Sequence, residues 1–113
     1  MENQENKTET SLTSKPAYIM VQMKAKSLED LTHRYAQFAI PILHKHGGQM
    51  IAGSPTPIVK EGEWNGNWAA VLRFPTMEAA EGWYNSAEYK PYKDLRINEI
   101  QSEAGSVVMI QGL

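Results

Sequence analysis

The stretch Ala17–Lys24 reads AYIMVQMK, and it decides the fold because it is apolar on both of its faces. Successive side chains of a β-strand point to opposite sides of the sheet. The two sets here are Ile19, Val21 and Met23 on one face, and Tyr18 and Met20 on the other. A sheet with one face in water normally alternates apolar and polar residues. This strand therefore predicts a sheet that is covered on both sides.

The following residues predict helices and strands in turn. Ser27 is a helix N-cap candidate with Asp30 in the capping-box position, and apolar residues then recur at spacings of three and four up to Ile42. Pro41 predicts a kink or break near residues 39–40. Asn65-Gly66 is a hairpin-turn signal. The remaining elements are expected as strands at 49–53, 58–60, 68–74 and 106–110, a helix capped by Thr76, and a helical stretch at about 90–98.

The order strand, helix, strand, strand, helix, strand predicts an α+β fold. Its most economical form is the ferredoxin-like βαββαβ sandwich, a four-stranded antiparallel sheet with helices on one face. A chain of 113 residues fits one domain, which we place at 17–113. Residues 1–16 are polar and are predicted to be a disordered N-terminal tail.

The strands at 68–74 and 106–110 also carry apolar residues on both faces, and helices can cover only one of these faces. A large exposed apolar patch is rare on a soluble monomer. Covering about 600 Å² of it would contribute on the order of 15 kcal/mol before the costs of association. We therefore expect a homodimer in which two sheets pack face to face as a dimeric α/β barrel.

Composition excludes several classes of function. The formal net charge is −2 and no Lys/Arg cluster is present, so no nucleic-acid partner is expected. No apolar run reaches the length of a signal sequence or a membrane span, so no membrane partner is expected. The chain has no cysteine, which excludes disulfides and thiolate sites and is typical of a cytoplasmic protein.

The stretch His44-Lys45-His46-Gly47-Gly48 could be a metal site or a helix end. The two histidines would lie about 200° apart on a helix, so they cannot bind one ion together. Gly47 is where a helix would end in a left-handed residue. We predict a helix end, no metal and no cofactor, with His46 remaining a candidate at the border of a cavity.

The chain resembles the family called domain of unknown function 1330, within the dimeric α/β-barrel superfamily. The resemblance covers Ala17 to about Leu113. It is carried by Tyr35, His46-Gly47-Gly48, Glu61-Gly62-Glu63-Trp64, Phe74-Pro75, Glu78-Ala79-Ala80, Trp83-Tyr84, Ser86, Glu88-Tyr89 and Arg96. It implies a ferredoxin-like subunit that pairs into a barrel. Related barrels include cofactor-free monooxygenases, lactone isomerases and haem-degrading enzymes, and carrying such an activity over would be an analogy of fold.

The sequence departs from this family at two places. Gly53-Ser54-Pro55 stands where members often have a basic residue and two glycines, and Arg73 stands where they often have an acid before Phe74-Pro75. An anion site of the relatives therefore does not carry over directly.

Seven residues are candidates for a site. The catalytic candidates are His46, Glu61 and Tyr84, and the ligand-binding candidates are Tyr35, Trp64, Arg73 and Arg96. His46 or Glu61 would move a proton, and the arginines would hold negative charge. Each also has a structural reading: Tyr35 as core, the turn at 61–64 as a plain turn, and Arg96 as half of an ion pair.

Two functions remain open. The first is a cofactor-free enzyme that acts on a small aromatic or anionic molecule in a subunit cavity. The second is a non-catalytic dimer that binds a small molecule or a protein, because no known catalytic arrangement is present. Haem binding through a single histidine is a third option. Whether the protein is an enzyme is left open by the sequence.

Overall fold

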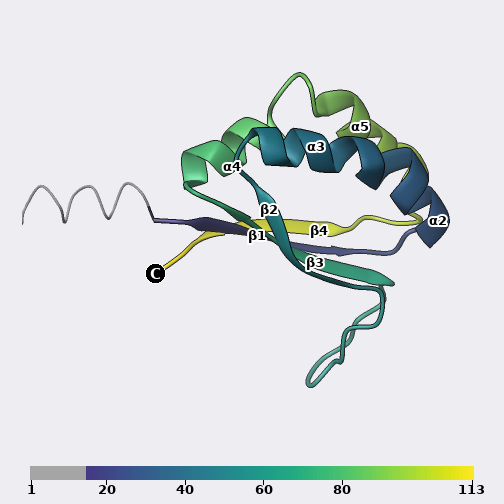
Figure 1. Ribbon diagram of the computed structural model, residues 1–113. Coiled ribbons are helices and arrows are strands. Elements are labelled where there is room, and N and C mark those ends of the chain that lie inside the picture. The colour runs from purple at the N-terminus through teal and green to yellow at the C-terminus, as the bar shows by residue number, and fades with distance from the viewer. Residues whose placement is uncertain (1–14) are drawn as a thin grey trace, which may run out of the picture.

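The computed structural model describes residues 15–113. The tail predicted at 1–16 thus lies outside the described residues, except for Lys15 and Pro16. In the described part, a four-stranded antiparallel sheet carries helices on one face (Figure 1). This arrangement confirms the predicted α+β, ferredoxin-like subunit.

The strands are β1 (Ala17–Met23), β2 (Gln49–Ser54), β3 (Trp68–Phe74) and β4 (Ser106–Gln111), in the order β2-β3-β1-β4. β1 is central, and its Ile19 lies opposite Leu72 of β3 and Met109 of β4. A bulge interrupts the edge strand β2 between Met50 and Ala52. The expected strand at 58–60 is absent, because residues 55–67 form an irregular loop.

The first connection is one continuous run of helical turns. It comprises α2 (Leu28–Asp30), the π-helical segment η1 (Leu31–Ala36) and α3 (Gln37–Lys45). Of the kink or break expected near 39–40, the break is wrong, since α3 continues through Pro41. The departure from α-helical geometry lies a turn earlier, in η1, and π-helical turns are a usual cause of helix bending.

The second connection has the same character. Helix α4 (Met77–Tyr84) is followed by a turn, then by α5 (Lys90–Leu95) and a second π-helical segment, η2 (Arg96–Ile100). The helical stretch expected at about 90–98 is present and runs two residues further. Figure 1 shows these helices on the same side of the sheet as α3.

The predicted helix ends are confirmed. The Asp30 amide donates to Ser27 Oγ at 3.1 Å, and the Ala79 amide donates to Thr76 Oγ1 at 3.0 Å. Gly47 has φ 85° at the end of α3, in the left-handed region that favours glycine. The stretch at 44–48 is therefore a helix end, as expected.

The 55–67 loop is fixed at its end by Asn67 and not by a hairpin turn. The Ala25 amide donates to Asn67 Oδ1 at 2.8 Å, and Asn67 Nδ2 donates to the Ala25 carbonyl at 3.0 Å. Gly62, rather than Gly66, has a positive φ, so the predicted Asn-Gly turn is wrong. The side-chain clamp of Asn67 to the end of β1 takes its place.

The two faces of the sheet differ in their surroundings. The inner face packs on the helices, and its Ile19 and Phe74 are 0% exposed. The outer face is also apolar, yet Met20, Val108 and Ile110 are 43–45% exposed in the single chain. Figure 1 shows the 55–67 loop projecting from the side opposite the helices. No helix formed by residues 15–113 is both long and apolar enough to cross a membrane.

Candidate ligand cavity

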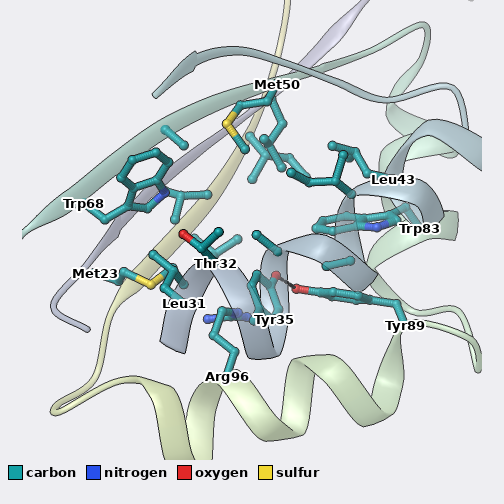
Figure 2. Close-up of a pocket in the computed structure, with 18 of the residues that line it drawn as sticks. Met23, Leu31, Thr32, Tyr35, Leu43, Met50, Trp68, Trp83, Tyr89 and Arg96 are labelled. Atoms are coloured by element: carbon teal, nitrogen blue, oxygen red, sulfur yellow. Dashed lines mark hydrogen bonds between the residues drawn. The ribbon is translucent and has the colours of Figure 1, made fainter. Parts of the chain in front are cut away.

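A cavity of about 460 Å³ lies between the helices and the inner face of the sheet (Figure 2). Its sheet side includes Ile19, Ala70 and Leu72, and its helix side includes Leu31 and Leu43. These side chains are apolar, and the volume falls within the range of small-molecule sites. The core of the subunit is therefore not completely filled by its own side chains.

The cavity opens beside the edge strand β2. Met50 and Leu28, which line it, are 37% and 38% exposed, and the neighbouring lining residue Pro55 is also exposed. Figure 2 shows Met50 and Arg96 at opposite ends of the lining. A molecule that entered past Met50 would therefore approach Arg96 from the apolar side.

One wall of the cavity is aromatic. Trp83 stacks on Tyr89 with ring centroids 4.3 Å apart, and Tyr84 packs edge-on against Trp83 at 6.1 Å. Tyr35, from η1, meets the edge of Tyr89 at 6.3 Å, and the hydroxyls of these two tyrosines share a hydrogen bond. Four aromatic side chains thus form a rigid surface with a paired set of hydroxyls.

Arg96 is the charged residue of the lining. It is the first residue of η2, is only 4% exposed, and donates from Nη1 to Gln101 Oε1. Within residues 15–113, no carboxylate oxygen lies within 4 Å of its guanidinium, although Arg34, Lys45 and Lys90 all have such partners. The ion pair considered for Arg96 from the sequence is therefore not formed with any described residue.

Burial raises the pKa of Tyr35 well above its usual 10, and the neighbouring Tyr89 adds to this effect. Tyr35 is partly buried as a residue, and its hydroxyl shares a hydrogen bond with that of Tyr89. Burial alone lowers the pKa of Arg96, and the oxygens of Tyr89 and Tyr35 outweigh that effect and raise it. Near neutral pH, Tyr35 is thus a hydrogen-bond donor and Arg96 is a cation.

Trp83 carries a further unused donor. Its side chain is 4% exposed, and its indole Nε1 is buried without a hydrogen-bond partner in the described part of the chain. Buried polar groups are normally paired. An unpaired donor in a residue that lines the cavity is consistent with a lining adapted to a bound molecule.

The structure brings together three of the seven candidates. Tyr35, Tyr84 and Arg96 line the cavity, whereas His46 does not and instead ends α3, where its amide donates to the Leu43 carbonyl at 3.1 Å. Glu61 is exposed in the 55–67 loop.

The two other candidates lie elsewhere. Trp64 borders a shallower polar hollow of about 220 Å³ with Lys24 and Glu103. Arg73 is exposed and belongs to the outer face of β3, opposite Tyr18. Neither residue lines the inner cavity, so the ligand-binding role expected for both has no counterpart at this site.

Sequence reasoning missed Tyr89, Gln101 and the site role of Trp83. Tyr89 and Trp83 belong to motifs that the family resemblance marks, so a signal was present for both. Gln101 gave none, since its position beside Arg96 depends on the π-helical turn of η2. The spacing of apolar residues does not distinguish a π-helical turn from an α-helical one.

The described residues offer no group of three or more His, Cys, Asp or Glu side chains that could hold a metal ion. The cavity lining contains none of these four residue types and no lysine. The chemistry available there is therefore hydrogen bonding by tyrosines, Thr32 and the indole N–H of Trp83, one positive charge, and apolar contact.

The chain belongs to the family described as "Domain of unknown function (DUF1330)", whose sequence profile matches residues 16–113. Among curated proteins, none matches the chain significantly.

Similarity to solved structures shows the fold alone. A protein of unknown function from Rhodopseudomonas palustris has a TM-score of 0.70 at 10% identity, over 100% of this chain and 94% of that one. An uncharacterised NIPSNAP-like domain protein from Burkholderia xenovorans has a TM-score of 0.58 at 10% identity, over 89% and 87%. A protein of unknown function from Nitrosomonas europaea has a TM-score of 0.54 at 14% identity, over 89% and 92%.

Proposed function

We propose that this member of the DUF1330 family binds a small, largely apolar organic molecule in the cavity between its helices and its sheet. The observation that supports this function is the cavity itself. It has about 460 Å³ of space inside an otherwise packed core, with an aromatic wall and a buried arginine. Packed interiors rarely keep voids much larger than a water molecule, and a large apolar pocket with a few polar groups is the usual form of a ligand site.

Binding is favoured over catalysis by the contents of the lining. The two proton-transfer candidates, His46 and Glu61, lie outside the cavity. Tyr35 is a poor general base near neutral pH, because burial raises its pKa. The non-catalytic alternative from the sequence is therefore the better supported of the two.

A cofactor-free enzyme is a second candidate, and one observation favours it. The hydrogen-bonded hydroxyls of Tyr35 and Tyr89 lie beside Arg96, and such a group could donate a proton while a cation holds developing negative charge. In this case Tyr35→Phe should abolish turnover of a bound molecule and leave its affinity within about threefold. Loss of affinity and turnover together would count against the catalytic role.

The neutral fluorescent probe N-phenyl-1-naphthylamine tests the binding function. We expect it to bind the wild-type protein and to bind Ala70→Phe at least about tenfold more weakly. Ala70 is 5% exposed and faces the cavity from β3, so the new ring fills the space. Ala87→Phe adds the same ring at an exposed turn and should bind as the wild type does.

Ala39→Leu fills the cavity from α3 and serves as a second variant if Ala70→Phe does not fold. Failure of the wild-type protein to bind the probe, or equal affinity in the wild type and a folded filled variant, would contradict the function. Native mass spectrometry of protein purified from its own cells would then identify any molecule that is retained.

We also propose that the protein is a homodimer, formed by the outer faces of two sheets. The exposed apolar side chains there are continuous across neighbouring strands: Met20 lies opposite both Val71 and Val108, and Ile110 lies opposite Tyr18. The 55–67 loop projects on the same side, and its Ile58 is 83% exposed. A two-fold axis would pair identical patches and would place each loop beside the other copy.

Light scattering at micromolar concentration should give a mass near twice the 12.7 kDa of the chain. A stable single-chain mass would contradict the dimer. The ligand cavity would be unaffected by that result, since all of its lining comes from one chain.

A further inference from the structure

The buried positive charge of Arg96 is not needed to bind a purely apolar ligand. The residue is 4% exposed, one of its donors is taken by Gln101 Oε1, and no described carboxylate lies within 4 Å of it. Removing a guanidinium from water costs free energy unless an anion or several hydrogen bonds compensate it. Gln101 supplies one such bond, and the oxygens of Tyr89 and Tyr35 also favour the charge, but no described residue supplies an anion. The guanidinium also belongs to the cavity lining, where a ligand could supply that anion.

The charge of the lining limits the anion. Arg96 supplies one positive charge, and no Asp, Glu, His or Lys side chain is among the lining residues. A monoanion would make the cavity neutral, whereas a phosphate dianion would leave an excess negative charge in an apolar space. A carboxylate also matches the planar fork of a guanidinium, with two parallel N–H···O bonds.

The guanidinium is held in position from outside the cavity. Gln101 is 7% exposed, accepts from Arg96 through Oε1, and donates through Nε2 to the Glu103 carbonyl at 3.2 Å. On the other side, the Arg96 Cζ lies 5.9 Å from the Tyr35 ring centroid. Figure 2 shows the guanidinium beside Tyr35, within the set of side chains that surround the cavity. A planar donor fixed in this way suits a planar acceptor.

The rest of the lining limits the body of the ligand. The cavity holds about 15 groups the size of a water molecule, from its 460 Å³ and about 30 Å³ each. The walls toward Met50 are apolar, so a body that extends from Arg96 toward the mouth meets few polar groups. An apolar chain or ring system of about ten carbons, with one acidic end, fits these limits.

We infer that the ligand is an apolar monocarboxylate, whose carboxylate binds Arg96 and whose apolar body fills the cavity toward Met50. This inference rests on the proposed binding function and adds the chemical class of the ligand. Gln101 is a positioning residue in this arrangement, because it orients Arg96 and does not line the cavity.

Competition against N-phenyl-1-naphthylamine tests the inference with matched molecules. Decanoate, decanol, decylamine and decyl phosphate share one chain and differ in the end group. At about pH 8 the carboxylic acid is ionised. We expect decanoate to displace the probe from the wild-type protein at a concentration at least about tenfold lower than any of the other three.

Variants assign that preference to Arg96. Arg96→Met should reduce the ratio between decanol and decanoate to about one, and Arg96→Lys should restore part of it. Arg34→Met is the matched control, since Arg34 is exposed on η1 and pairs with Glu99 outside the cavity. It should keep the full preference.

Three results would overturn the inference while leaving the binding function intact. These are equal displacement by decanol and decanoate, stronger displacement by decyl phosphate or decylamine, and a preference that survives Arg96→Met. The comparison of decanoate with the other three molecules uses only the wild-type protein. It therefore tests the inference even if a variant does not fold. A probe that fails to bind the wild type would remove the binding function and this inference together.

Discussion

The inner and outer faces of this sheet are built from similar apolar residues, yet they have different surroundings. On β1, Ile19 is 0% exposed on the inner face, and its neighbour Met20 is 43% exposed on the outer face. Helices of the same chain cover the inner face and leave a cavity, whereas nothing in the described chain covers the outer face. A strand that is apolar on both sides thus predicts that both faces of the sheet are covered. It does not indicate which face is covered by helices of the same chain.

The largest difference between the faces should appear in stability. Phe74 is 0% exposed on the inner face, and its ring centroid lies 5.6 Å from that of Trp83. Phe74→Ala should lower the free energy of unfolding by about 3–5 kcal/mol. Val71→Ala, on the outer face of the same strand, should lower it by about 1 kcal/mol. Urea denaturation at one protein concentration measures both, and similar losses would contradict a core confined to the inner face.

The outer face should respond mainly in assembly. Val108→Glu places a carboxylate at the centre of the exposed apolar patch, opposite Met20. In the proposed dimer it should weaken association on the order of 100-fold, because each copy buries an unpaired charge. Sedimentation or light scattering over a dilution series measures this, with circular dichroism to confirm that the subunit remains folded. A variant that dimerises as tightly as the wild type would exclude this face as the interface.

The inner face also contains a group that should make stability depend on alkaline pH. Below pH 10 both the folded and the unfolded chain keep the Tyr35 proton. The neutral Tyr35 side chain therefore makes its full contribution to the free energy of unfolding there. Above pH 10 the unfolded chain releases the proton while the folded chain keeps it, because burial raises the pKa of Tyr35. Stability is therefore lost up to the folded-state pKa, at no more than about 1.4 kcal/mol per pH unit.

Tyr35→Phe should remove this part of the alkaline loss, measured as the difference in slope between the two proteins in denaturant titrations. Identical slopes in wild type and Tyr35→Phe would show that Tyr35 ionises alike in both states.

The smallest expected effect concerns the helices that cover the inner face. Thr76→Ala removes the hydroxyl that caps α4 through the Ala79 amide and should cost about 1 kcal/mol. Thr56→Ala, in the exposed loop, should stay within about 0.5 kcal/mol of the wild type. Thermal or urea unfolding measures both, and equal costs would show that the cap at Thr76 contributes nothing specific.

Much of the fold could be predicted because local chemistry and tertiary packing agree. Ser27, Thr76 and Gly47 each mark a helix end by a property of their own side chain or backbone, and the structure has helix ends at all three. The period of a strand placed Trp68, Ala70, Leu72 and Phe74 on one face of β3, and in the structure this is the inner face, with the last three buried. Where tertiary contacts decide, as at Asn67 and its clamp on Ala25, the Asn-Gly turn signal was misleading.

The candidate site was predictable in part. Tyr35 and Arg96 come from the two π-helical segments, which are packed against each other. The wider turn changes the direction of side chains by a fraction of a turn, and residue spacing does not reveal it. His46 and Glu61 were attractive because their chemistry suits catalysis, but their side chains belong to a helix end and an exposed loop. Chemical type without direction was insufficient to assemble the site.

The interruption of β2 between Met50 and Ala52 has a consequence for how copies of this protein can meet. A regular edge strand offers an unbroken row of backbone donors and acceptors, which can recruit a strand from another molecule. In β2 the hydrogen-bond register shifts by one residue at the bulge, and a bulge increases the local twist of the strand. Addition of a further strand along this edge is thereby disfavoured, which leaves β4 as the one edge of the described sheet with a regular ladder.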